Sequence, residues 1–143
     1  AMKPIKFRAW VENRKIMGTA LAIRFSRDGH YVAHLKDETG FHWETEAILM
    51  QFTGLHDRHG KEIYEGDILQ LDGGGKEMPC LPVEWNPLSA QWCVRAPWLK
   101  DKSNPLVPLE AYVSMNFCEL EILGNIYEHP HLLTERQRKE EET

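Results

Sequence analysis

The chain has 143 residues, about the length of one ordinary domain, with 42% hydrophobic and 27% charged side chains. This composition argues against a disordered chain. The longest apolar runs, such as residues 47–50, have only a few residues, whereas a membrane-spanning helix needs roughly 20. The net charge is −5, and no basic segment leads into an apolar stretch, so we expect a cytoplasmic protein that is neither secreted nor bound to a membrane.

The N-terminal third predicts a β-meander. Residues 5–10 alternate apolar and basic side chains with the period of two of a half-buried strand. Residues 20–25 predict a return strand, and Asp28-Gly29 predicts a tight turn into a third strand at 31–35.

The rest of the chain continues in short strands. We expect them at residues 48–52, 68–71, 83–85, 92–94 and 120–123. Prolines in residues 97–108 predict an exposed loop there, and residues 111–117 predict either a strand or a short helix.

The expected fold class is therefore mainly β: a small antiparallel β-barrel or meander with an N-terminal hairpin lobe and at most short helices. We expect residues 1–133 to form one β domain, or two small lobes at 1–53 and 54–133. Residues 134–143 are expected to form a charged, flexible tail.

Glycine and aspartate residues stand at the expected strand ends. The set is Gly54, Asp57, Gly60, Gly66, Asp67 and Gly124. Glycine adopts left-handed backbone at little cost, and an aspartate carboxylate can accept hydrogen bonds from amides two or three residues on. The set predicts a structural turn motif, with Ile63, Tyr64, Ile68, Ile126 and Tyr127 supplying core.

Three segments carry a resemblance to a known family. Residues 2–10 (MKPIKFRAW), 49–69 (LMQFTGLHDRHGKEIYEGDIL) and 120–133 (LEILGNIYEHPHLL) resemble the signature blocks of the YopX family of bacteriophages and prophages. The likeness is weaker between residues 72 and 118. The resemblance implies a mainly β phage protein in the cytoplasm of a bacterial host, with no established activity or catalytic residues to carry over.

Candidate chemistry is sparse. A zinc site could be imagined from His56, His59, His129 and His131 with Cys80, but these histidines lie in polar turns without the usual ligand spacing. Glu62, Glu65 and Asp67 near Tyr64 could mimic a general acid and base, although the same residues serve a turn equally well. We predict no catalytic, cofactor or metal site.

The cysteines also lack the spacing of a functional site. Cys80, Cys93 and Cys118 form no CxxC pair, and an odd number cannot complete a disulfide framework. They are expected to be buried, reduced thiols.

The leading functional hypothesis is non-enzymatic binding or assembly, with a homo-oligomer and an unknown host or phage protein as partners. Residues 3–17 carry five basic side chains against one acidic, whereas residues 36–77 are acidic overall, an opposed distribution that can favour self-association.

The alternative is nucleic-acid binding on the N-terminal strand. Its possible binding face comprises Lys6, Arg8, Trp10, Arg14 and Lys15. Basic side chains could contact phosphates and an exposed indole could stack a base. A pI near 5.8 makes this the less favoured reading.

Overall fold

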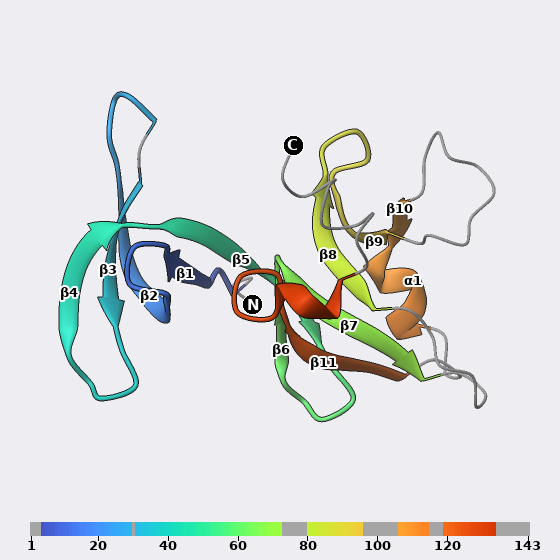
Figure 1. Ribbon diagram of the computed structural model, residues 1–143. Helices are drawn as coiled ribbons and strands as arrows, with labels where there is room; N and C mark the ends of the chain where they lie inside the picture. Colours follow the sequence, from blue (N-terminus) through green and yellow to red (C-terminus); the bar gives the residue numbers. More distant parts are fainter. Residues whose placement is uncertain (1–3, 30, 73–79, 96–105, 115–118, 134–143) are drawn as a thin grey trace. The chain divides into compact units, whose positions relative to one another are not determined.

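Antiparallel strands dominate the computed structural model, which describes residues 4–29, 31–72, 80–95, 106–114 and 119–133 (Figure 1). One sheet has the order β4-β3-β2-β1-β5-β6 and contains β1 (Phe7–Val11), β2 (Ile16–Phe25), β3 (Tyr31–Lys36), β4 (His42–Glu46), β5 (Ile48–His56) and β6 (Glu62–Tyr64). The other has the order β10-β9-β8-β7-β11 and contains β7 (Asp67–Asp72), β8 (Leu81–Asn86), β9 (Gln91–Arg95), β10 (Leu106–Pro108) and β11 (Glu119–Asn125). An α-helix, α1 (Leu109–Ser114), and a 3-10 turn, η1 (Pro130–Leu132), complete the described elements.

The chain divides into two compact units, residues 1–52 and 53–143. The alternative lobe boundary expected from the sequence lay one residue later, between 53 and 54. Strand β5 crosses the division: residues 48–51 pair with β1, and the strand lies beside β6 at its other edge. Each unit is described by itself below.

The mainly β class is confirmed, and so is the meander. Strands β1 to β4 pair in chain order, each antiparallel to the next. Both sheets end in edge strands, so no closed barrel is present in the described parts of the chain, and the barrel arrangement is wrong.

The first unit builds its core on one face of its sheet. Ala9, Val11, Ala33 and Leu35 are fully or almost fully buried there, and Trp43 packs against them. Ala9 pairs with Gly18, where an added Cβ would lie 3.5 Å from that of Leu35. Small residues at these positions give the larger Leu35 room on the same face.

The second unit has its own cluster. Leu69 from β7, Leu81 from β8 and Val94 from β9 are 0% exposed, and Leu109 at the start of α1 joins them. Ile63 and Ile68, both expected in the core, are also fully buried. Tyr64, Ile126 and Tyr127 are only half-buried.

Three strands were not expected: β4, β6 and β10. Strand β6 has three residues and is too short to recognise from its sequence. Residues 106–108 form β10, at the edge of the sheet beside β9, whereas the prolines predicted a loop over 97–108. Pro108 is tolerated because an edge strand has one side that needs no ladder hydrogen bond. Residues 42–46 form β4, which has one large apolar side chain, Trp43, and therefore too weak an alternation to be recognised.

Other expectations have mixed outcomes. Of the two structures considered for 111–117, the helix is found, at 109–114. Residues 97–105, 115–118 and the tail 134–143 lie outside the described residues. In the part of the chain that is described, no helix has the length and apolar character needed to cross a membrane.

Candidate functional site

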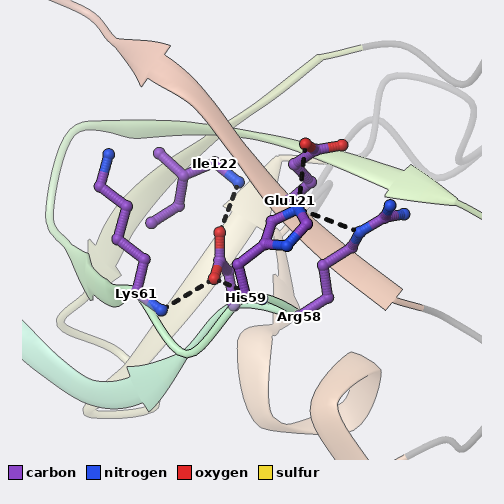
Figure 2. Close-up of polar contacts among 6 residues, drawn as sticks. Arg58, His59, Lys61, Glu121 and Ile122 are labelled. Atoms are coloured by element: carbon purple, nitrogen blue, oxygen red, sulfur yellow. Dashed lines mark hydrogen bonds and ion pairs between the residues drawn. The ribbon is translucent and has the colours of Figure 1, made fainter.

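Asp57 holds the turn between β5 and β6 and ties it to β11 (Figure 2). Its Oδ1 accepts hydrogen bonds from the amides of His59 and Lys61, both at 2.9 Å. Its Oδ2 accepts the amide of Ile122 at 3.2 Å. Gly60 completes the turn at φ 80°, in the left-handed region that favours glycine.

The charge state of Asp57 follows from these contacts. Burial alone would raise its pKa, but the amides of Lys61, Ile122 and His59 stabilise the carboxylate more strongly, and the net pKa lies below the usual aspartate value. A carboxylate with three backbone donors is committed to holding the turn and is poorly placed to accept a substrate proton.

Side chains on the outer side of this turn form a polar chain (Figure 2). His59 Nε2 lies 3.3 Å from Glu121 Oε1 on β11 and 3.3 Å from Arg58 Nε. The backbone amide of Arg58 donates to Leu120 O at 2.8 Å. The turn is therefore fastened to β11 by both main chain and side chain.

A second turn, at Gly66 and Asp67, contacts the residue that directly follows β11. Asp67 is 1% exposed, and its Oδ2 accepts the amide of Tyr64 at 2.8 Å. Gly66, at φ 82°, accepts the amide of Ile126 through its carbonyl at 2.9 Å. Tyr64 donates its hydroxyl to Glu62 Oε2 at 3.0 Å.

Gly124 belongs to β11 itself, beside a register shift in its pairing with β7. A Cβ there would lie 2.5 Å from His129 Nδ1, an impossible contact, and that Nδ1 accepts the Asn125 amide at 3.2 Å. Five of the six turn residues thus surround β11 and the turn that follows it. Gly54, at φ 86° in β5, is exposed, with open space where a Cβ would be.

The N-terminal basic residues are spread over a strand and a turn. Arg8 and Trp10 share one face of β1 by alternation, Lys6 immediately precedes that strand, and Arg14 and Lys15 lie in the β1–β2 turn. Lys6 Nζ is 5.5 Å from the Phe52 ring centroid, Arg14 covers the Trp43 ring at 4.8 Å, and Lys15 pairs with Glu12. These cations contact groups of their own unit.

Trp10 is almost fully enclosed. Its side chain is 3% exposed, and its indole Nε1 donates to Glu12 Oε2 at 2.5 Å. It is among the residues that line an open groove in the first unit, together with Glu46 and Ile48. At 3% exposure the residue offers almost no surface on which a base could stack.

The histidines considered as zinc ligands do not gather. Across the described ranges, no three His, Cys, Asp or Glu side chains are arranged to hold a metal ion. Cys80 and Cys93 are reduced, half-buried and buried respectively, and burial raises the pKa of both thiols. Cys118 lies outside the described residues.

Two clusters were not found by sequence reasoning. Trp85 and Trp92 face each other across β8 and β9, edge to face with ring centroids 4.9 Å apart. His34, His42 and Glu44 lie together on β3 and β4. Both clusters depend on strand register, and the second requires β4 to be recognised first.

These features define a class: a mainly β protein of two antiparallel sheets in which Gly and Asp turns converge on the last strand. A family model described as YopX protein matches residues 6–134, and the chain belongs to the YopX family.

Solved structures share this fold. Protein EF1440 from Enterococcus faecalis matches with a TM-score of 0.60 and 22% identity, covering 93% of this chain and 100% of that one. The protein yopX from Bacillus subtilis matches with a TM-score of 0.59 and 17% identity, covering 90% of this chain and 95% of that one. No curated protein matches the chain.

Proposed function

We propose that this protein is a phage or prophage accessory protein of the bacterial cytoplasm that works by non-enzymatic binding and assembly, and that it associates with copies of itself. The observation that carries the proposal is a supported apolar surface on the β8–β9 hairpin. It comprises Trp85, Leu88 and Trp92, and is called the tryptophan hairpin below.

The tryptophan hairpin is held firmly from beneath. Trp92 packs against the core cluster of the second unit, and Trp85 rests edge-on against Trp92. Asn86 Oδ1 accepts the Leu88 amide at 3.1 Å, which fixes the turn. Trp85 nevertheless remains 43% exposed and Leu88 97% exposed. Rigid, exposed aromatic groups of this kind typically supply most of the binding energy at protein interfaces.

The acidic residues support a non-enzymatic role. Asp57 and Asp67, the buried carboxylates of the signature turns, both accept backbone amides. Their chemistry is accounted for by the fold, and a binding function makes no further demand on them.

A second copy of the chain is the occupant that we propose for the tryptophan hairpin. A pair of such surfaces can bury its aromatic groups against itself under twofold symmetry, as most homodimers do. Apolar association should persist at high salt, whereas association through the opposed charges should be lost there.

Light scattering at micromolar concentrations, at low and high salt, tests the proposal. We expect a dimer or larger species that Leu88→Asp converts to monomer. Leu21→Asp, an equally drastic change at a 52% exposed site in the first unit, should leave the assembly intact.

Two results would contradict the proposal. A wild-type monomer at every concentration and salt would remove self-association. A shift of single-stranded DNA or RNA at low salt, lost when Lys6 and Arg14 are replaced by alanine, would favour nucleic-acid binding instead.

A further inference from the structure

We infer that His34 and His42 form a chelating site for a divalent transition-metal ion, Cu²⁺ in preference to Ni²⁺ or Zn²⁺, with Glu44 beside the non-coordinating nitrogen of His34. The site bridges the β3–β4 hairpin of the first unit. It is independent of the tryptophan hairpin.

Strand register brings the two imidazoles together. His34 on β3 is directly opposite Glu44 on β4, and His42 occupies the diagonal position on the same face. His34 Nε2 and His42 Nδ1 are 3.0 Å apart, and the ring centroids are 5.3 Å apart. On its β2 side, His34 is opposite Ala22, whose small side chain leaves the imidazole room.

Glu44 lies beside the other ring nitrogen of His34. Its Oε1 is 3.8 Å from His34 Nδ1. In the metal-free chain His34 Nε2 and His42 Nδ1 share a hydrogen bond, which a bound ion would replace. A carboxylate beside the non-coordinating ring nitrogen is the usual arrangement around a metal-binding histidine.

The preference among metals follows from the type of ligand. Sites of nitrogen ligands generally bind Cu²⁺ more tightly than Ni²⁺ or Zn²⁺. The 3.0 Å between the two nitrogens is a hydrogen-bond distance in the metal-free chain and places both within reach of one ion.

Binding needs no redox step. The ion exchanges two of its water molecules for two neutral imidazole nitrogens, and water keeps the other positions. Lys36 and Glu46 share this face with the pair through the β3–β4 register. Their opposite charges leave the field near the site close to balanced.

The experiment uses the full chain without an affinity tag. Titration calorimetry with Cu²⁺ should show one equivalent bound more tightly than free imidazole binds it. Electron paramagnetic resonance of that species should show two coordinated nitrogens. We expect both Ni²⁺ and Zn²⁺ to bind more weakly than Cu²⁺.

Matched variants assign the site. His34→Gln and His42→Gln should each weaken Cu²⁺ binding by about tenfold or more, and Glu44→Gln by about tenfold, the lower end of the usual effect of losing an orienting carboxylate. His59→Gln is the control, because this exposed histidine also pairs with a glutamate but faces no second imidazole. Wild-type affinity in both His34→Gln and His42→Gln, or an equal loss in His59→Gln, would overturn the assignment.

Discussion

The carboxylate of Asp57 satisfies three backbone amides that come from two distant parts of the chain, residues 59–61 and residue 122. An aspartate that only shaped its own turn would accept the amides of residues 59 and 61 alone. Because Asp57 also accepts the amide of residue 122, its loss should destabilise the packing of the turn against β11 as well as the turn itself.

Asp57→Asn should destabilise the protein by about 3 kcal/mol at pH 7, because an amide presents one acceptor and one donor to three buried N–H groups. Asp37→Asn is the matched control: Asp37 accepts the amides of Thr39 and Phe41 and the hydroxyl of Thr39, all within its own exposed turn. Urea unfolding followed by tryptophan fluorescence measures both. Equal losses would show that the Ile122 contact contributes nothing.

The pKa of Asp57 sets a pH dependence. Because its pKa is lower in the folded chain than in the unfolded chain, the ionised carboxylate stabilises the fold above the unfolded value, about 3.9, and this contribution disappears as pH falls through the folded value. The free energy of unfolding of the wild type should therefore decline below about pH 4. The decline should be shallower in Asp57→Asn, and parallel profiles would refute the assignment.

Gly60→Ala and Gly124→Ala should each destabilise the protein, for different reasons. Gly60 has a positive φ and open space around its missing Cβ, so Gly60→Ala should cost about 1 kcal/mol of backbone strain. Gly124→Ala places its Cβ against the His129 ring and should cost more. His129→Ala should recover part of that loss and none of the Gly60→Ala loss, as measured by urea unfolding of the double variants.

The turn chemistry of these residues could be predicted from the sequence, because glycine and aspartate act locally. Their partners could not. Nothing near Asp57 in the sequence points to Ile122, and the closeness of Gly124 to His129 depends on the turn that Asn125 forms.

At the scale of elements, the β8–β9 hairpin also carries an ion pair, on the face opposite the two tryptophans. Arg95 donates to both oxygens of Glu84, Nε to Oε2 and Nη2 to Oε1, each at 2.8 Å. Both side chains are less than one third exposed. A two-pronged pair at this depth should contribute more than a surface pair.

A double-mutant cycle on Glu84→Gln and Arg95→Gln should give a coupling energy of about 1–2 kcal/mol. The Glu12 and Lys15 pair, whose side chains are 62% and 68% exposed, should show no measurable coupling in the same cycle. Thermal or urea unfolding supplies the four stabilities. Coupling of the same size in both pairs would mean that exposure does not decide their strength.

Elements with strong alternation or flanking turns could be predicted, and weakly patterned ones could not. Strands at 83–85 and 92–94 were expected, and the segment Asn86-Pro87-Leu88-Ser89 between them has the composition of a turn. Strand β4 has polar residues at most of its positions and forms because β3 offers it a full set of partners from Val32 to Lys36. Such a strand forms because its neighbour pairs with it, so its own sequence need not show the alternation typical of a strand.

At the scale of the whole molecule, each unit has a separate apolar cluster. Leu35 belongs to the first and Leu69 to the second, and both are 0% exposed. Leu35→Ala and Leu69→Ala should each lower the free energy of unfolding of their own unit by about 3 kcal/mol. Amide hydrogen exchange should accelerate mainly in residues 4–52 for the first variant and mainly after residue 53 for the second. Equal acceleration throughout both units would contradict separate cores.

The pairing of β7 with β11 also sets an order of events during synthesis. Strands β1 to β4 and the first half of β5 precede residue 53, so most of this sheet can assemble while later residues are still in the ribosome. The second unit must wait, because β7 at 67–72 pairs with β11 at 119–125, and residues 73–118 lie between them. Closing so long a loop is entropically costly and slow. Until β11 emerges, the nascent chain therefore exposes one side of β7, and a ribosome that stalls before residue 119 leaves a strand edge open to aggregation.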